Sequence, residues 1–380
     1  MRLFPKKIIF VHLLNDYSGS PLVLSQVINS LSEEEYEKIL FTSTSSNSGF
    51  LSNLNGVETK TFWYSWSSNP WWRLITYSIS QSILFFRLLS YWRKDVVIYV
   101  NTLLPFGAAL AGKFMGKKVI YHVHETSMKP PLLKKFLRFV ANSTANGILH
   151  VSNYLAQKEN FPGTKNKVLY NTLSHEFVLE SQKYLREAIP KDSFRVLMLC
   201  SLKKYKGVDD FFMLAHQMPS VNFELVLNAT EEEVSEYVSI AGKPANLEVH
   251  SSQKNVHPFY QKSSLVLNLS HPDQWIETFG MTALEAMYYK LPVIVPTVGG
   301  IAEIVENGYN GFHLDYRSLN EMQEKIEELV INKSLYNTLS ENAFKYAQKF
   351  NESEYRENLN GLVREFIQNS DPVQKSILLR

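Results

Sequence analysis

Two glutamates are side chains of a type and spacing that could recognise a sugar. Glu277 and Glu285 lie in the segment 277–287, which follows the apolar run 265–270. Thr278 is placed to cap a helix, which puts Glu277 just before that helix and Glu285 about two turns into it. Carboxylates accept paired hydrogen bonds from vicinal hydroxyls, as sugars and riboses present them. The spacing predicts two carboxylates at different depths of one binding-site opening. Two solvated glutamates on a helix would give the same pattern.

Two helix starts and one lysine suit a phosphate. The first-turn amides of that helix would be unpaired donors at the positive end of its dipole. They belong to Phe279, Gly280, Met281 and Thr282. Gly299 and Gly300 follow the apolar run 292–296, and paired glycines let backbone amides approach an anion closely. Lys206 lies in a basic loop after another apolar run, 194–200. Two anion-suited helix starts on neighbouring units favour a phosphate site over an ordinary turn.

Residues that bind metals are sparse. No Asp-x-Asp pair occurs, and Asp209 and Asp210 lie early in a predicted helix with no obvious partner. The single cysteine, Cys200, excludes an internal disulfide and a cysteine-built metal site, and it fits a reducing compartment such as the cytoplasm. We therefore predict no metal and a phosphate site built from lysine and helix dipoles.

The histidines are mostly typical of a protein core. His12, His150 and His250 lie in apolar runs, where a buried and hydrogen-bonded histidine is the ordinary interpretation. His124 follows a predicted strand of an α/β fold, a position where ligands commonly bind. For His124 a structural and a functional role both stay open.

The scaffold that would position these residues is an α/β fold. The length of 380 residues predicts two or three domains, and 45% hydrophobic with 20% charged residues excludes a disordered or fibrous chain. Apolar β-branched runs alternate with helical patterns, which is typical of parallel sheets buried on both faces. The predicted strands are 7–13, 96–100, 119–123, 147–151, 167–169, 194–200, 222–227, 247–250, 265–270, 292–296 and 311–314. We expect two open sheets joined through the polar stretch 174–193.

Helix boundaries are marked in a few places. Ser20-Pro21 and Asn69-Pro70 each combine a capping residue with a proline at the first helical position. From residue 318 onward the sequence shows helical periodicity and no strand pattern. These signals place helices after the first strand, across 71–94 and over the C-terminal end.

Four motifs of the second half occur in a characteristic order. They are the strand end and basic loop 200–208 with Lys206, the pair Glu277 and Glu285, the run 291–300 with Gly299 and Gly300, and the segment 303–312. This combination resembles the retaining, nucleotide-sugar-dependent glycosyltransferases of the GT4 family, which have the GT-B fold. The first half fits more loosely, through the loop 15–21 with Gly19 and Ser20 and through His124 at a strand end.

The resemblance implies two doubly wound, Rossmann-like α/β domains facing a cleft. Residues 1–178 would form the acceptor-binding domain and residues 179–350 the nucleotide-sugar-binding domain. Residues 351–380 would form a C-terminal helix, about 352–368, that crosses back to the first domain.

The resemblance also implies roles for individual residues. Lys206 would contact the donor diphosphate, Glu277 a hydroxyl of the donor sugar, and Glu285 the ribose. The amides of residues 279–282, Gly299 and Gly300 would complete the diphosphate cradle, with Gly19 and Ser20 also on the donor. His124 would face the reacting sugar, so His124 and Glu277 are the catalytic candidates. Ser201 stands where the family usually has an arginine, which removes a bidentate phosphate donor that Lys203 or Lys204 could replace as a point charge.

The predicted activity is retaining transfer of a hexose-type sugar. The donor would be a UDP- or GDP-linked sugar, the acceptor a glycan or polyprenyl-linked glycan of surface polysaccharide biosynthesis, and no cofactor, metal or nucleic acid is expected. A nicotinamide-dependent oxidoreductase is disfavoured because no Gly-x-Gly-x-x-Gly occurs. A non-catalytic relative that binds nucleotide sugar or serves as a scaffold is the alternative, which Ser201 supports.

Charge is distributed unevenly along the chain. Residues 1–180 contain 19 Lys and Arg against 11 Asp and Glu, a net charge of +8, whereas residues 181–380 contain 20 against 26, a net charge of −6. The segments 71–94 and 128–138 combine aromatic or aliphatic residues with basic ones and could lie on an anionic membrane, or could simply cover the first sheet. We expect a cytoplasmic protein, with peripheral attachment to the inner face of the membrane as an option.

Overall fold

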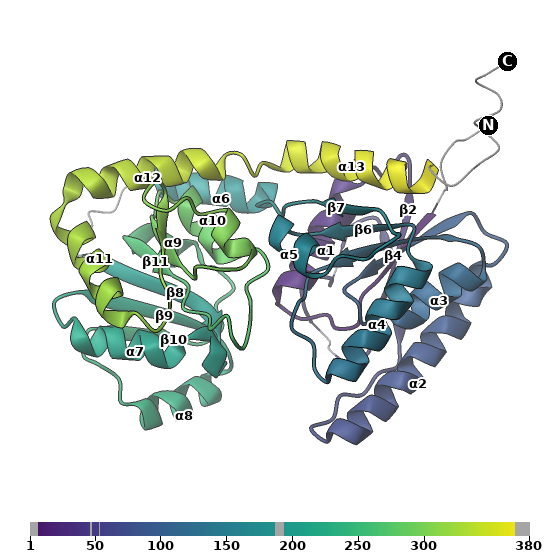
Figure 1. Cartoon of the computed structure of the whole chain (residues 1–380), viewed down its shortest axis with the longest axis horizontal. Coiled ribbons are helices and arrows are strands. Elements are labelled where there is room, and N and C mark those ends of the chain that lie inside the picture. The colour runs from purple at the N-terminus through teal and green to yellow at the C-terminus, as the bar shows by residue number, and fades with distance from the viewer. Residues whose placement is uncertain (1–6, 46–47, 53, 187–193, 369–380) are drawn as a thin grey trace, which may run out of the picture. The chain divides into compact units, whose positions relative to one another are not determined.

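The computed structural model describes residues 7–45, 48–52, 54–186 and 194–368. It divides into two compact units, one of Met1–Tyr170 with Ser353–Arg380 and the other of Asn171–Glu352. The sequence placed the boundaries at 178 and 350. Each unit is a parallel sheet flanked by helices (Figure 1).

The first unit is built on a seven-stranded sheet of order β3-β2-β1-β4-β5-β6-β7. Every neighbouring pair is parallel. The strands are β1 Lys7–Val11, β2 Glu37–Ser43, β3 Val57–Phe62, β4 Val96–Asn101, β5 Lys118–Val123, β6 Gly147–His150 and β7 Asn166–Val168. The helices are α1 Gly19–Ser30, α2 Pro70–Leu88, α3 Phe106–Phe114, α4 Pro131–Thr144, α5 Asn153–Lys158 and α13 Glu352–Gln368, and a 3-10 turn, Leu89–Tyr91, follows α2.

The second unit has a six-stranded parallel sheet of order β10-β9-β8-β11-β12-β13. The strands are β8 Arg195–Ser201, β9 Asn222–Asn228, β10 Leu247–His250, β11 Leu265–Leu267, β12 Val293–Val295 and β13 Gly311–His313. The helices are α6 His175–Arg186, α7 Val208–Gln217, α8 Glu231–Ala241, α9 His257–Lys262, α10 Met281–Tyr288, α11 Leu319–Ile331 and α12 Lys333–Ala347. Short 3-10 turns lie at Lys204–Lys206 and Gly300–Glu303. In both sheets the chain order reverses once, between β1 and β4 and between β8 and β11.

The eleven predicted strands are confirmed to within a few residues at their ends. Strands β2 and β3 were missed. The sequence of β3, VETKTF, is mostly polar because the strand lies at the edge of the sheet and exposes most of its side chains. Burial on both faces produces the apolar runs on which strand prediction depends, so an edge strand gives little signal.

The helix boundaries were predicted with mixed success. Asn69 caps α2 as expected, since its Oδ1 accepts hydrogen bonds from the amides of Trp71 and Trp72 at 2.9 and 3.2 Å. The prediction at Ser20-Pro21 is wrong, because α1 begins at Gly19. The expected connection 174–193 contains α6, which belongs to the second unit, while residues 187–193 lie outside the described part.

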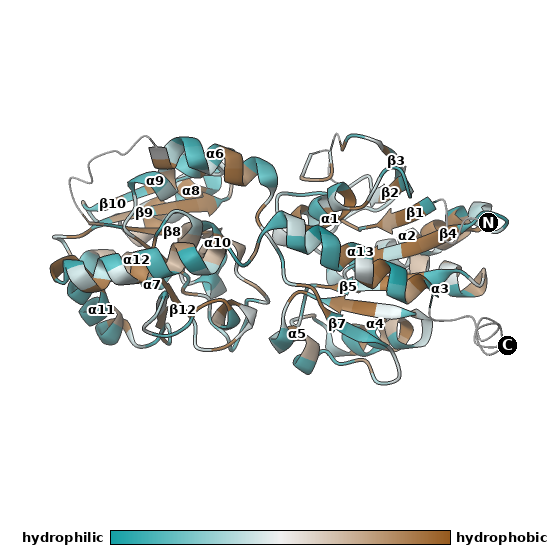
Figure 2. Ribbon diagram, turned by 90° about the horizontal axis from the view of Figure 1, so that it is seen from above, coloured by the Kyte–Doolittle hydropathy of each residue, from teal (hydrophilic) through white to brown (hydrophobic). Residues whose placement is uncertain are grey.

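The C-terminal helix packs into the core of the first unit, which confirms the predicted crossing. Tyr355, Leu359, Val363 and Phe366 of α13 are buried in one cluster with residues of α1, β1 and β4. Gly147 opens β6 beneath this helix, and a Cβ there would lie 2.3 Å from the ring of Phe366. Apolar residues concentrate in the strands of both sheets (Figure 2). Each unit therefore has its own hydrophobic core.

Candidate functional site

Two of the predicted site residues, Lys206 and Glu277, meet where the strand order of the second sheet reverses. Lys206 ends the 3-10 turn after β8, and Ser270 and Glu277 lie in the loop after β11, the strand hydrogen-bonded beside β8. In open α/β sheets, ligands bind outside the carboxyl ends of the strands at such a reversal. Lys206 and Glu277, which are 71 positions apart in the sequence, are thereby brought into contact.

Glu277 is held by three polar partners. Lys206 Nζ donates to its Oε1 in an ion pair, and Ser270 Oγ donates to the same oxygen at 2.8 Å. Burial by itself raises the pKa of Glu277, but the charge of Lys206 and hydrogen bonds from Lys206, Ser270 and Asn268 together leave that pKa below its ordinary value. The carboxylate is therefore ionised and acceptor-only at neutral pH. Ser270 is a member of this site that the sequence analysis did not identify.

Two glycines allow the loops after β11 and β12 to pack against each other. Gly280 has φ +98°, and a Cβ there would lie 2.4 Å from Ile301. Gly299 has φ +112°, and a Cβ there would lie 2.5 Å from the carbonyl oxygen of Glu277. Gly300 N–H donates to that same carbonyl at 2.8 Å. The paired glycines thus fix the backbone of Glu277, because the amide of Gly300 is used in this hydrogen bond.

The start of α10 differs from the expectation. The helix begins at Met281 and is capped by the backbone of Gly280, so the prediction that Thr278 caps it is wrong. Gly280 sits in a left-handed conformation that a side chain would strain. Met281 and Thr282 provide first-turn amides, whereas Phe279 is buried before the helix. The second expected helix start is the four-residue 3-10 turn Gly300–Glu303.

Glu285 lies about one turn into α10, not two. Its Oε2 accepts a hydrogen bond of 2.6 Å from the hydroxyl of Tyr260, a fully buried residue of α9. Burial raises the pKa of Glu285 to about 7, and the bond from Tyr260 only partly opposes this. Glu285 therefore changes charge near neutral pH, whereas Glu277 does not.

Aromatic and histidine side chains surround the Lys206 turn. Tyr205 and Trp275 are stacked with their centroids 5.4 Å apart, and Lys206 Nζ lies 5.6 Å from the centroid of Trp275. His271 Nε2 is 2.6 Å from Asp210 Oδ2. The expectation that Asp209 and Asp210 have no partner is therefore wrong, since Asp209 in turn accepts a hydrogen bond from the hydroxyl of Tyr237. These contacts join loops and helices that are far apart in the sequence, so spacing gives no signal of them.

In the first unit, Asn101 joins the two regions that the sequence singled out. His124 Nε2 lies 2.8 Å from Asn101 Oδ1, and Asn101 Nδ2 donates to the carbonyl of Ser20 at 3.1 Å. The same amide lies 3.1 Å from His12 Nδ1. Asn101 ends β4, beside the reversal of that sheet, and its role was not predicted. Gly19 opens α1, and a Cβ there would meet open space among the described residues.

The histidines of this group are neutral. Burial, followed by the charges that His122 and His12 would carry, holds the pKa of His124 well below its usual range. Burial also lowers the pKa of His12 to about 4 and that of His122 to about 3. His124 therefore donates through Nε2–H to Asn101 Oδ1, because a neutral ring needs a proton on the nitrogen facing an acceptor.

Glu125, the neighbour of His124, is a second carboxyl with a perturbed pKa. Its oxygens accept hydrogen bonds of 3.1 Å from the amides of Leu103 and His124. Burial nevertheless raises the pKa of Glu125 to about 7. The carboxyl fixes the backbone of His124 against the loop after β4.

The other two histidines predicted to lie in a core, His150 and His250, have ordinary partners. His150 is buried and lies 3.0 Å from Asn166 Oδ1, as expected for a core histidine. His250 is only half-buried and lies 3.0 Å from Glu224 Oε1, so the expectation of a core position is wrong for it. Glu224, Glu248 and His250 are close enough to share an ion. However, Lys262 Nζ already pairs with the buried Glu224 at 2.6 Å, so this carboxylate has a cation as its partner.

Comparisons with known proteins agree with this architecture. The family described as glycosyl transferases group 1 matches residues 182–346. An uncharacterized glycosyltransferase of Methanocaldococcus jannaschii is 31% identical over 55% of this chain and 57% of its own length. The capsular polysaccharide biosynthesis glycosyltransferase CapM of Staphylococcus aureus is 26% identical over 52% of this chain and 53% of its own length. The chain thus spans little more than half the length of these relatives.

A solved structure extends the likeness to the whole fold. HepE of Anabaena, in complex with UDP and glucose, has a TM-score of 0.75 and 19% identity, covering 94% of this chain and 99% of its own. The protein has the GT-B fold, and its residues 182–346 are similar to the glycosyl transferases group 1.

Proposed function

We propose that this protein is a retaining glycosyltransferase that moves a hexose-type sugar from a nucleoside-diphosphate sugar to a glycan or polyprenyl-linked acceptor. The proposal includes transfer without a metal or cofactor and a place in surface polysaccharide biosynthesis. The observation that carries it is the group formed by Lys206, Glu277 and Ser270 at the strand reversal of the second sheet.

The chemistry of this group suits a sugar diphosphate. An ionised carboxylate accepts hydrogen bonds from sugar hydroxyls, and the lysine beside it supplies positive charge for a leaving diphosphate. The amides of Met281 and Thr282 add donors at the positive end of α10. Because Lys206 is paired with Glu277, the lysine shares its charge between the carboxylate and an incoming diphosphate. Positive charge from lysine and a helix end is the basis for expecting no requirement for a divalent ion.

His124 supplies the complementary group of the first unit. Its neutral ring is oriented through Nε2 by Asn101, so Nδ1 is the nitrogen left to accept a hydrogen bond from a sugar hydroxyl. Asn101 also donates to the carbonyl of Ser20 and thereby fixes the first turn of α1, which begins at Gly19. We propose that these residues form the acceptor side of the site.

The donor base and the acceptor class rest on the relatives. A solved neighbour binds UDP and glucose, which favours a UDP-linked donor over a GDP-linked one, and the relative CapM is named for capsular polysaccharide biosynthesis. A non-catalytic sugar-nucleotide-binding protein is the second candidate, because Ser201 at the end of β8 removes a strong phosphate donor.

Release of nucleoside diphosphate from a panel of UDP-, GDP-, ADP- and dTDP-sugars tests the proposal. An enzyme releases the diphosphate with one or two of these donors, more rapidly with acceptor, and Glu277→Ala abolishes the release. A scaffold binds a donor, visible as a thermal shift of the protein, without releasing diphosphate. Anomeric analysis of the product by NMR distinguishes retention from inversion.

A further inference from the structure

Helix α2 of the first unit buries several polar side chains and exposes several large apolar ones. Its buried positions include Thr76, Ser80 and Gln81, each at most 2% exposed. Large apolar side chains lie on its exposed positions. They are Trp71, Trp72, Leu74, Ile75, Ile79 and Phe86, which are 40–75% exposed. A surface helix of a globular protein ordinarily buries its apolar stripe and exposes its polar one.

The buried polar groups of α2 are satisfied inside the unit. Thr76 Oγ1 donates to the carbonyl of Ser65 at 2.7 Å, and Gln81 Oε1 accepts from the amide of Gly107 at 3.1 Å. These bonds fix which face of the helix points outward. The outward apolar stripe is therefore a property of the folded unit.

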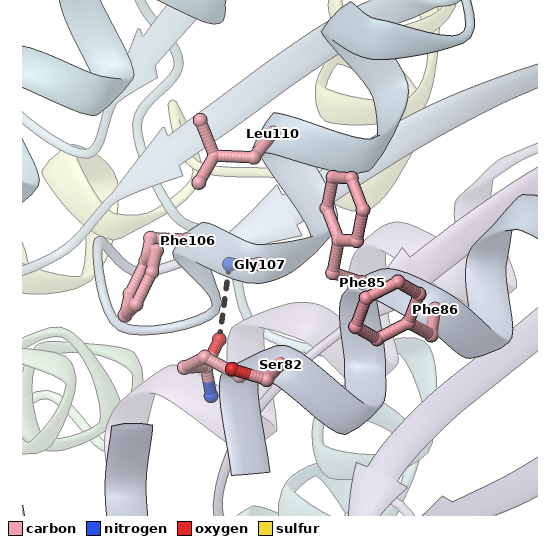
Figure 3. Close-up of a pocket in the computed structure, with 7 residues that line it drawn as sticks. Ser82, Phe85, Phe86, Phe106, Gly107 and Leu110 are labelled. Atoms are coloured by element: carbon pink, nitrogen blue, oxygen red, sulfur yellow. Dashed lines mark hydrogen bonds between the residues drawn. The ribbon is translucent and has the colours of Figure 1, made fainter. Parts of the chain in front are cut away.

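The stripe continues onto α3 and α4 through two groups of rings in contact. The ring of Phe114 lies 5.9 Å from Phe85 and 5.2 Å from Trp92, and the rings of Phe106 and Phe136 lie 5.1 Å apart. A groove of about 260 Å³ lies between α2 and α3, and its lining includes Phe85, Phe86, Phe106 and Leu110 (Figure 3). We define the aromatic surface as Ile75, Ile79, Phe85, Phe86, Trp92, Phe106, Leu110, Phe114 and Phe136.

The segment that carries this surface is strongly basic. Residues 63–145 contain eleven Lys and Arg against two acidic residues, a net charge of +9. Arg93 and Lys94 are exposed next to Trp92 in the chain, and Lys113 is exposed next to Phe114. On α4, Lys134 and Arg138 both pair with the buried Glu159, so that helix contributes less free charge than its sequence indicates.

We propose that the aromatic surface lies in the headgroup region of an anionic phospholipid bilayer. Tryptophan rings favour the membrane–water interface, exposed isoleucine and phenylalanine side chains would insert into it, and lysine and arginine are attracted to anionic headgroups. A second copy of the chain fits less well, because a symmetric interface would bring two such basic segments together. None of the helices in the described residues is long and apolar enough to cross a membrane.

Co-sedimentation with vesicles tests the proposal on the full chain. Vesicles of phosphatidylcholine alone are compared with vesicles containing one third phosphatidylglycerol. The protein binds the anionic vesicles, with an affinity that falls as salt is raised because the Debye length shortens. Five of the six tryptophans lie in residues 63–92, so binding also shifts tryptophan emission to shorter wavelength. Trp275→Phe removes the one tryptophan of the second unit and leaves that shift in place.

Matched variants distinguish binding through this surface from non-specific binding to vesicles. Ile75→Ser with Ile79→Ser weakens vesicle binding about tenfold or more. Ile240→Ser with Ile331→Ser removes two more exposed isoleucines, 79% and 81% accessible, from the second unit and leaves binding unchanged. Arg93→Gln with Lys94→Gln weakens binding about thirtyfold, from roughly a fivefold loss for each basic residue near the surface. The control for charge is Lys333→Gln with Lys345→Gln, which removes two exposed lysines of the second unit and leaves binding unchanged. Circular dichroism checks that each variant is folded.

Three outcomes overturn the proposal. They are equal binding to neutral and anionic vesicles, equal losses in the test and control variants, and a dimer in light scattering that Ile75→Ser with Ile79→Ser dissolves while vesicles are not bound. Vesicle binding requires neither donor nor acceptor. Its failure is therefore distinguishable from failure of the transferase proposal.

Discussion

Replacing Glu285 by glutamine should make the second unit more stable at alkaline pH. Burial raises the pKa of this carboxyl from its ordinary 4.5 to about 7 in the folded protein. Between these values the folded state holds a proton that the unfolded state has released, so stability is lost as pH rises through this range and is constant above it. The difference in pKa corresponds to about 3 kcal/mol. Glutamine stays neutral and can still accept the hydrogen bond from Tyr260.

The measurement must report on the second unit alone, since Glu125 of the first unit also has a pKa raised to about 7. Hydrogen exchange of peptides covering Met281–Tyr288, followed through urea unfolding at pH 5 and pH 8, gives that local reading. Wild type should lose about 2.5 kcal/mol between the two values relative to Glu285→Gln. Glu324→Gln, at an exposed position of α11, should behave as wild type. Parallel losses in wild type and Glu285→Gln would refute the burial argument.

The same titration gives a test of ribose binding. If ribose hydroxyls donate to ionised Glu285, binding of UDP at pH 7 should release roughly half a proton. The enthalpy measured by calorimetry should then depend on the ionisation enthalpy of the buffer, and Glu285→Gln should remove that dependence. A buffer-independent enthalpy in wild type would place Glu285 away from the nucleotide.

The other predictions concern turnover and packing. Glu277→Ala should chiefly lower kcat, whereas Glu285→Ala should chiefly raise the donor KM, and wild-type kinetics for both would contradict the donor site. Transfer should persist in EDTA, and a loss reversed by Mn²⁺ or Mg²⁺ would count against metal independence. Asn101→Leu should lower kcat about tenfold or more by releasing His124 while UDP affinity stays unchanged, and a weaker UDP affinity would contradict that role. Phe366→Ala should cost about 3–5 kcal/mol of stability in urea unfolding of the first unit, and a near-neutral change would contradict the packing of α13.

The sequence predicted the buried part of the fold well. Central parallel strands are apolar on both faces, so runs such as 194–200 and 222–227 predicted β8 and β9 directly. The polar edge strand β3 has no such signature. The polar stretch 174–193 suggested a linker although it contains α6, because exposed helices and loops share similar compositions.

The candidate site was predicted by residue type but not by contact. The sequence identified Lys206 and Glu277 separately, and only the sheet order shows that β8 and β11 are neighbours. Ser270 and Asn101 were missed because serine and asparagine at strand ends are common. The glycine pair was expected to cradle a phosphate, yet in the fold Gly300 donates to Glu277. Which way a backbone amide points depends on how two loops pack, and local sequence does not contain that information.

Burial explains why the two strand reversals carry different chemistry. The His124 group is enclosed with His12 and His122, so desolvation keeps these rings neutral and leaves hydrogen bonding through Asn101 to orient them. At the other reversal, Glu277 keeps its charge because Lys206 and Ser270 offset the cost of burial. A neutral, oriented ring suits a hydroxyl, and a paired charge suits a diphosphate. Under the proposed transfer, the first of these reversals would bind a sugar hydroxyl and the second the charged leaving group.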